Sequence, residues 1–176
     1  APAESYWSMI NAGKMGTAGF LRWAYDAWVA DPLTDVTHNA FEPGDCFLFY
    51  PDHKDAAEPV GKSSVRLEKM AEGVRDVNKL KYMEQEIPSL KEDIDALYNA
   101  VSTTAGSGKT YLSPEKIAIL SEEMDTFKEG VAELTGKYLA LKEAGTDQVE
   151  AVTIEEGGSV ELSIGRTLQL HGLILP

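Results

Sequence analysis

The segment FLRWAYDAW at residues 20–28 holds four aromatic residues, with one arginine and one aspartate among them. Flat rings pack on the apolar C–H faces of a sugar, and a nearby carboxylate accepts hydrogen bonds from sugar hydroxyls. Trp23, Asp26 and Trp28 are therefore candidates for carbohydrate contact. A tryptophan-rich corner of a protein core would have the same composition, and the residue types alone do not favour either interpretation.

The same segment has the length of a strand, and we expect one there. Side chains alternate between the faces of a strand, so Trp23 and Tyr25 would lie on one face and Trp28 on the other. A strand with rings on both faces must be covered on both, which favours the middle of a layered or barrel fold. Asp26 and Trp28 would then lie at the carboxyl end of the strand, where α/β barrels have their active sites.

Other motifs with catalytic chemistry are weak. The sequence GSGKT at 106–110 lacks the earlier glycine of a phosphate-binding loop, because Thr103 occupies that position. A helix is also expected before GSGKT, where a phosphate-binding loop needs a strand. We therefore interpret GSGKT as an interhelical loop. A single cysteine, Cys46, excludes an internal disulfide. No zinc-binding spacing joins the three histidines, His38, His53 and His171. We expect no metal site and no cofactor.

Composition narrows the class of partner. The 176 residues include 43% hydrophobic and 26% charged residues, as in folded globular proteins, and the formal net charge is −13. Residues 1–60, 61–145 and 146–176 are each acidic, which argues against a nucleic-acid partner. No apolar run has the length of a membrane span. The ends, APAESYW and LHGLILP, lead us to expect a piece of a longer protein.

Helical periodicity dominates the middle of the chain. We expect a short helix at 8–16, an amphipathic helix at 63–86 and, after Pro88, a helix restarted by a capping box from Ser89 to Glu92. A further helix begins at Ser113-Pro114 and carries apolar residues at alternating steps of three and four. That stripe calls for a partner helix, and residues 90–103 are the nearest candidate for an antiparallel hairpin. We favour a core role for the stripe over a dimer interface.

Period-two alternation replaces the helical period after Gly145. Val152, Ile154, Val160, Leu162 and Ile164 alternate with polar residues, and glycines mark the turns. Residues 146–176 are therefore expected to form short antiparallel strands.

Four motifs in order resemble the C-terminal part of the catalytic domain of glycoside hydrolase family 123, also catalogued as domain of unknown function 4091. They are APAESYW, GFLRWAYDAWVADPLTD, FEPGDCFLFYPD and SSVRLEKMAEGVRDVNKLKYM, within residues 1–86. The resemblance implies a (β/α)8 barrel and β-N-acetylgalactosaminidase activity. Residues 20–28 would be the eighth strand, 29–62 its loop and 63–86 the closing helix, while PAESYW would be the loop after strand seven.

The resemblance also implies site residues. Glu4, Trp23 and Trp28 match residue types in the family pattern, and Trp7 is a further substrate-binding candidate. Asp26 departs from the pattern, because relatives often have Asn there. The family's mechanism uses the 2-acetamido oxygen of the substrate as nucleophile, with an adjacent Asp-Glu pair that orients it and donates the proton. No such pair precedes residue 86, so we expect it upstream and assign no catalytic residue to this chain.

Residues 146–176 resemble the first strands of a bacterial Ig-like domain of group 2, through VTIEEGGSVELSIGRTLQL. Residues 87–145 would then be a helical spacer. The expected architecture is an α/β fragment: the last strands and helices of the barrel, a helical hairpin or bundle, and short antiparallel strands. The expected protein is a secreted or cell-surface glycoside hydrolase acting on an N-acetylated glycan, with the remainder of its barrel as partner. The alternative is a non-catalytic surface module that binds a glycan or has a structural role.

Overall fold

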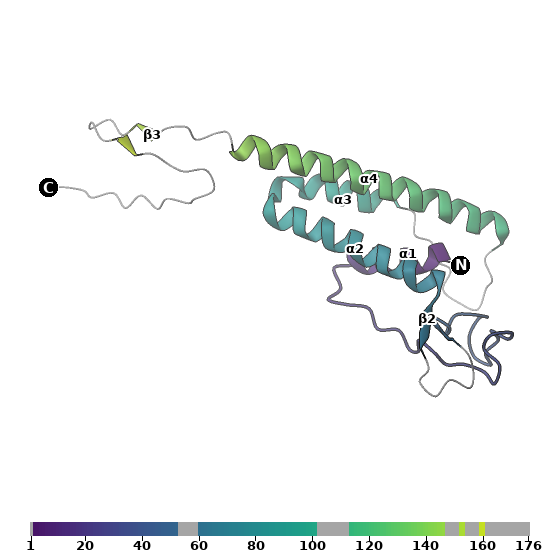
Figure 1. Ribbon diagram of the computed structural model, residues 1–176. Coiled ribbons are helices and arrows are strands. Elements are labelled where there is room, and N and C mark those ends of the chain that lie inside the picture. Colours follow the sequence, from purple (N-terminus) through teal and green to yellow (C-terminus); the bar gives the residue numbers. More distant parts are fainter. Residues whose placement is uncertain (1, 53–59, 102–112, 147–151, 154–158, 161–176) are drawn as a thin grey trace. The chain divides into compact units, whose positions relative to one another are not determined.

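The computed structural model describes residues 2–52, 60–101, 113–146, 152–153 and 159–160 (Figure 1). The described chain is mostly helical, with two antiparallel pairs of short strands. It divides into two compact units, Ala1–Leu134 and Thr135–Pro176. This mixed α/β content agrees with the expected fold class, whereas all the strand pairs formed by the described residues are antiparallel.

Helix α1, Pro2–Lys14, opens the first unit. Proline suits the first helical turn, and Glu4 and Lys14 have the charge signs that the helix dipole favours at its two ends. Its buried residues recur at helical spacing: Ala3, Tyr6, Trp7, Met9 and Ile10. Gly16, at φ 67°, follows the helix in the left-handed conformation that ends many helices. The expected loop at PAESYW is therefore wrong, and the expected helix at 8–16 begins six residues earlier.

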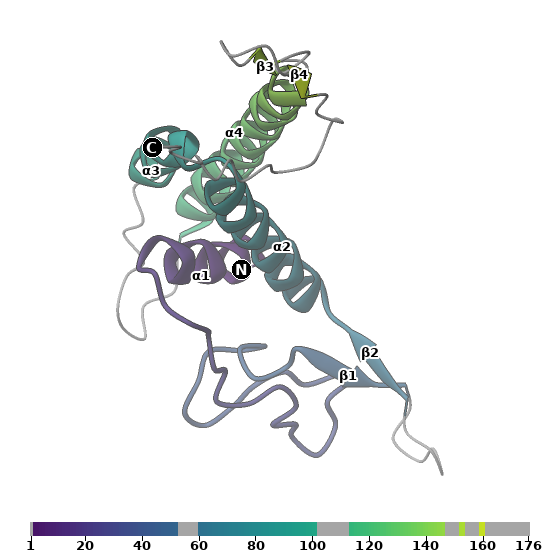
Figure 2. The same ribbon diagram turned by 90° about the vertical axis from the view of Figure 1, so that its left-hand side faces the viewer.

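Helix α2, Val65–Glu86, confirms the helix expected at 63–86. Its N-cap is Ser64, whose Oγ accepts a hydrogen bond from the Leu67 N–H at 3.3 Å. The helix packs closely against α1 (Figure 2): a Cβ added at Gly73 would lie 2.8 Å from the Cβ of Met9 and from the carbonyl oxygen of Tyr6. Glycine at this position lets the two helices approach.

After α2, a 3-10 turn, η1 (Pro88–Leu90), leads directly into α3, Lys91–Ala100. The predicted capping box is wrong. Ser89 lies inside the 3-10 turn, Leu90 is the N-cap of α3, and no side chain caps the helix. Leu90, Ile94 and Tyr98 are buried and give α3 its apolar face.

Helix α4, Pro114–Thr146, begins where Ser113-Pro114 predicted, and Ser113 Oγ accepts a hydrogen bond from the Lys116 N–H at 3.4 Å. A Cβ added at Gly130 would lie 2.5 Å from Leu97 on α3. The ring of Phe127 lies 5.9 Å from that of Tyr98. These contacts confirm the expected α3–α4 pairing, with the two helices antiparallel in Figure 1. The core role of the apolar stripe is confirmed at Met124, Phe127 and Val131, which are buried.

Between α1 and α2, the described residues 17–52 and 60–64 contain little regular structure. Strands β1, Phe49–Pro51, and β2, Gly61–Ser63, pair antiparallel with Phe49 opposite Ser63. Strand β1 lies at the end of the apolar stretch CFLFYP, residues 46–51. The expected strand over 20–28 is wrong, since it is reduced to one bridge, Asp26 to Phe47. A central strand needs hydrogen-bonded neighbours on both edges, and in this region of the described chain only residues 46–49 supply them.

The second unit contains the end of α4 and two short strands. Strands β3, Val152–Thr153, and β4, Ser159–Val160, pair antiparallel. Their pairing matches the first of the alternating strands expected after residue 145. The remaining strands expected at 161–176 lie outside the described residues. Among the helices of the described chain, none is both long and apolar enough to cross a membrane.

Candidate functional site

The five predicted substrate-binding residues lie in two different settings. Glu4 and Trp7 are on α1, while Trp23, Asp26 and Trp28 belong to the irregular segment between α1 and β1. Both settings belong to the first compact unit.

Trp7 is a packing residue of the helical core. Its side chain is 4% exposed, and its Nε1–H donates a hydrogen bond to the Leu120 carbonyl on α4 at 2.9 Å. The rings of Tyr6 and Phe127 meet it edge-on at centroid distances of 5.6 and 5.7 Å. The indole N–H and much of the ring are thus used to join α1 to α4. Glu4, in the first turn of α1, is half-buried.

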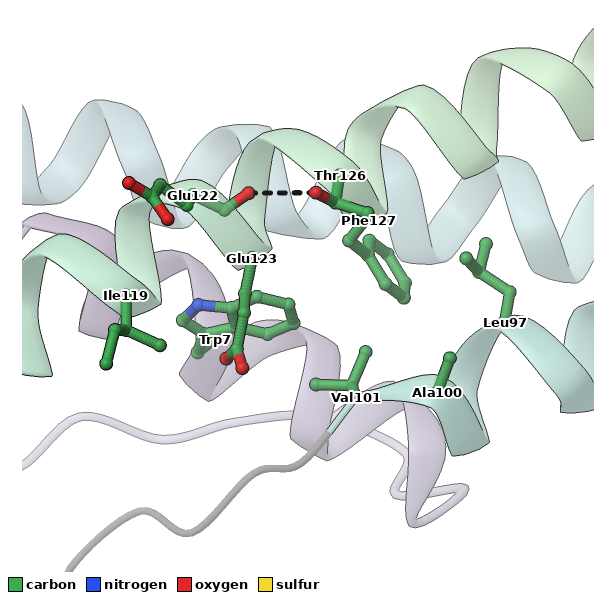
Figure 3. Close-up of a pocket in the computed structure, with 9 residues that line it drawn as sticks. All are labelled: Trp7, Leu97, Ala100, Val101, Ile119, Glu122, Glu123, Thr126 and Phe127. Atoms are coloured by element: carbon green, nitrogen blue, oxygen red, sulfur yellow. Dashed lines mark hydrogen bonds between the residues drawn. The ribbon is translucent and has the colours of Figure 1, made fainter.

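A cavity of about 260 Å³ lies beside Trp7, between α1, α3 and α4 (Figure 3). Its walls are mainly apolar, and the carboxylates of Glu122 and Glu123 add a negative charge. The hydroxyl of Thr126 donates to the backbone carbonyl of Glu122 at 3.1 Å. The complete lining is Trp7, Leu97, Ala100, Val101, Ile119, Glu122, Glu123, Thr126 and Phe127. None of the other four predicted substrate-binding residues lines this cavity.

Trp23, in contrast, is exposed and belongs to a group of three rings that we call the three-ring cluster: Trp23, His38 and Phe41. The indole is 70% exposed and Phe41 is 37% exposed. Ring centroids lie 5.0 Å apart for Trp23 and Phe41, 6.1 Å for Trp23 and His38, and 5.2 Å for His38 and Phe41. Neither His38 nor Phe41 was expected from the sequence to contact substrate, although Phe41 is the first residue of the motif FEPGDCFLFYPD.

Trp28 and Asp26 lie further along the same segment. The Nε1–H of Trp28 donates to the Phe49 carbonyl at 2.8 Å, which fixes the indole while 36% of the residue stays exposed. Asp26 is held through its backbone, opposite Phe47, and is an exposed residue. The backbone N–H of Leu48 donates to the carbonyl of Tyr25 at 2.8 Å. This pairing holds the aromatic segment against residues 46–49.

Arg66 on α2 anchors residues 46–49, which pair with the aromatic segment. Its Nη2 donates to the Phe47 carbonyl at 2.9 Å and to the Tyr50 hydroxyl at 2.7 Å. The guanidinium passes within 3.0 Å of the place where a Cβ would stand on Gly44, whose φ is 80°. Glycine is therefore suited to position 44 for two reasons, the left-handed backbone and the close approach of Arg66.

The charged groups beside the aromatic segment are paired. Arg22 forms an ion pair with Asp45 and also donates to the Asp45 carbonyl at 2.6 Å. Burial raises the pKa of the adjacent Cys46 thiol, as does the charge of Asp45, so the thiol is not an activated nucleophile. The described residues contain no group of three His, Cys, Asp or Glu side chains that could hold a metal ion.

Buried polar groups in the helical core have structural partners. The hydroxyl of Tyr6 donates to Asp76 Oδ2 at 2.8 Å, and burial together with this hydrogen bond raises the pKa of Tyr6. Burial raises the pKa of Tyr98 to about 12, helped by the charge of Glu84. These hydroxyls keep their protons at neutral pH and can act as donors within the core.

Comparison with known proteins relates the chain to one enzyme family. Residues 1–83 match the family model for the glycoside hydrolase 123 catalytic domain. A solved family 123 glycoside hydrolase from Clostridium perfringens, analysed for the details of glycolipid glycan hydrolysis, is similar at a TM-score of 0.70 and 33% identity. The likeness covers 81% of this chain and 25% of that chain, so this chain spans about a quarter of the enzyme. No curated protein matches the sequence.

The structural likeness covers more of the chain than residues 1–83, so it extends beyond the segment that the family model matches. The predicted boundary between a catalytic part and a helical spacer at residue 86 remains a prediction, as does the Ig-like domain at 146–176. The resemblance drawn from the sequence motifs is confirmed in its central part: residues 1–83 are similar to part of the catalytic domain of family 123 glycoside hydrolases.

Proposed function

We propose that this chain is part of a secreted glycoside hydrolase that releases terminal N-acetyl-hexosamine, with β-linked N-acetylgalactosamine as the preferred residue. The observation that carries the proposal is the match of residues 1–83 to the glycoside hydrolase 123 catalytic domain. The similarity to the Clostridium perfringens enzyme, at 33% identity, supports the same class of reaction.

In this proposal the chain supplies substrate contacts. Trp23 and Trp28 present exposed ring surface to the C–H faces of the sugar, and the exposed carboxylate of Asp26 accepts hydrogen bonds from hydroxyls. Glu4 is proposed as a further contact from the first turn of α1. Trp7 is assigned to the support of this unit, because its indole is buried between helices.

The remaining catalytic machinery is proposed to lie upstream in the parent protein, on the rest of a (β/α)8 barrel. An Asp-Glu pair there would orient the 2-acetamido group, whose oxygen attacks the anomeric carbon, and would protonate the leaving oxygen. The exposed apolar side chains of the loop region support a covering partner of this kind: Phe20, Leu21, Tyr25 and Leu33. The helical spacer and the Ig-like domain complete the proposed exported protein.

The direct test is hydrolysis of nitrophenyl glycosides by the intact parent protein. We expect release of nitrophenol from the N-acetyl-β-galactosaminide. Replacement Trp28→Ala should weaken transition-state binding by about 1–3 kcal/mol, because a ring that packs on the sugar is lost. The measurement is kcat/KM for both proteins.

The matching galactoside without the acetamido group is the control substrate, and it should not be hydrolysed at a comparable rate. Equal rates on the two substrates would contradict participation of the acetamido oxygen. Absence of turnover on every N-acetylated aryl glycoside would contradict the enzymatic function, and retained sugar binding in that case would favour a glycan-binding module.

A further inference from the structure

We propose that His38 and Phe41 form, together with Trp23, one contact surface for an uncharged sugar residue of the substrate. The inference rests on the proposed function and extends it, because it adds two substrate-contacting residues. Neither residue was expected from the sequence to contact substrate.

The rings of the three-ring cluster pack against one another. Each of its rings lies within 6.1 Å of the other two, yet Trp23 is 70% exposed and Phe41 is 37% exposed. Trp7 provides a contrast within the same unit, since its two ring contacts bury it to 4% exposure. Mutual contact therefore positions the rings of the cluster without covering them. The Trp23 and Phe41 planes are inclined by 34° at a centroid distance of 5.0 Å, so the two rings partly stack and hold each other in place.

His38 has a fixed orientation. Its Nδ1 accepts a hydrogen bond from the Ala40 N–H at 3.1 Å. With Nδ1 as the acceptor, Nε2 carries the proton and can donate to a sugar hydroxyl at the edge of the ring surface. Just before His38 in the chain, the carboxylate of Asp35 accepts hydrogen bonds from the N–H and the hydroxyl of Thr37, at 2.9 and 2.7 Å. The turn that presents His38 is thus held by its own hydrogen bonds.

The positive charge next to Trp23 in the chain is compensated. Arg22, the neighbour of Trp23 in the chain, is paired with the carboxylate of Asp45 and bonded to its carbonyl. Its charge is compensated, so it offers little to an anionic sugar. Two apolar ring faces with one donor at their edge suit a neutral pyranose, which has both an apolar face and hydroxyls.

The experiment uses the intact parent enzyme and its nitrophenyl N-acetyl-β-galactosaminide substrate. We expect Phe41→Ala and His38→Ala each to raise KM by about tenfold, equivalent to about 1.4 kcal/mol, with a smaller change in kcat. Phe41→Tyr, which keeps the ring, and His38→Gln, which keeps a donor, should stay within about threefold of the wild-type KM. Tyr82→Ala, an exposed tyrosine on α2, is the matched control and should leave KM unchanged.

Binding of free N-acetylgalactosamine, measured by titration calorimetry on the same proteins, separates this inference from the proposed function. Loss of affinity in Phe41→Ala and His38→Ala supports the contact surface even when turnover is absent. The contact surface would be overturned if both variants unfold normally and keep the wild-type KM and affinity. The hydrolase assignment would still stand in that case. A fall in thermal stability with unchanged KM would overturn the contact surface too, and would identify the rings as a protein interface. Should Phe41→Ala fail to fold, the comparison of Phe41→Leu with Phe41→Tyr decides whether the ring itself is needed.

Discussion

At the scale of single residues, the carboxylate of Glu72 binds two lysines from two different helices. Its carboxylate on α2 accepts hydrogen bonds from Lys69, at 2.8 Å on the same helix, and from Lys128, at 2.7 Å on α4. The hydrogen bonds from Lys128 and Lys69, in that order, lower the pKa of Glu72. One carboxylate therefore joins two helices of the first unit.

This arrangement predicts a pH dependence of stability. Because the pKa of Glu72 is lower in the folded state, its contribution is present above pH 4.5, its ordinary pKa, and is lost as pH falls through the lowered value. Glu72→Gln should reduce the free energy of unfolding at pH 7 by about 1 kcal/mol, and by less at pH 3. Urea unfolding at both pH values measures the difference.

The matched control for Glu72 is Glu133→Gln, an exposed position on α4. Equal effects of Glu72→Gln at pH 7 and pH 3 would show that the ion pairs contribute nothing to folding.

Residue chemistry alone left two interpretations open for Trp23 and Trp28, sugar contact and core packing, whereas Trp7 was expected only to bind substrate. Trp7 serves the core, while Trp23 and Trp28 keep exposed ring surface. Nothing local distinguishes the three, since burial depends on which helices cover a ring. His38 and Phe41 were missed for a similar reason: they meet Trp23 only through the path of the loop between them.

At the scale of elements, the helices were the most predictable part. Ser64 and Ser113 supply N-caps, and the apolar faces of α2 and α4 repeat at helical spacing, so local sequence defines both helices. The segment at 20–28 failed as a strand because strand formation depends on neighbours that are distant in sequence. The Ser89 capping box failed because Pro88 begins a 3-10 turn that takes Ser89 inside it.

Because α1 and α2 pack closely at Gly73, we expect that a larger residue there destabilises the fold. A methyl group at Gly73 would lie 2.8 Å from Met9 Cβ and from the Tyr6 carbonyl, so the helices must separate to accept it. Gly73→Ala should lower the free energy of unfolding by about 1–3 kcal/mol. Denaturant unfolding followed by circular dichroism at 222 nm, a helix signal, checks this.

Gly136→Ala on α4 is the control, because a methyl group there meets no atom of the described residues within 4 Å. It should be neutral or stabilise the helix by up to about 1 kcal/mol. Equal stability of Gly73→Ala and wild type would contradict the close approach of α1 and α2.

At the scale of the whole molecule, the chain combines a packed helical core with a loop region that leaves large apolar side chains exposed. The chain spans about a quarter of its structural relative. The sequence motifs identified the family resemblance, yet the (β/α)8 barrel and the Ig-like domain remain predictions, because both require strands outside the described residues.

The central claim is that residues 20–41 present rings to a sugar in the intact enzyme. The most direct measurement is a crystal structure of the parent protein with N-acetylgalactosamine bound. The rings of Trp23 and Trp28 should lie in van der Waals contact with the pyranose, about 4 Å from its carbons. A sugar bound at a distant site, with both tryptophans covered by protein, would contradict it.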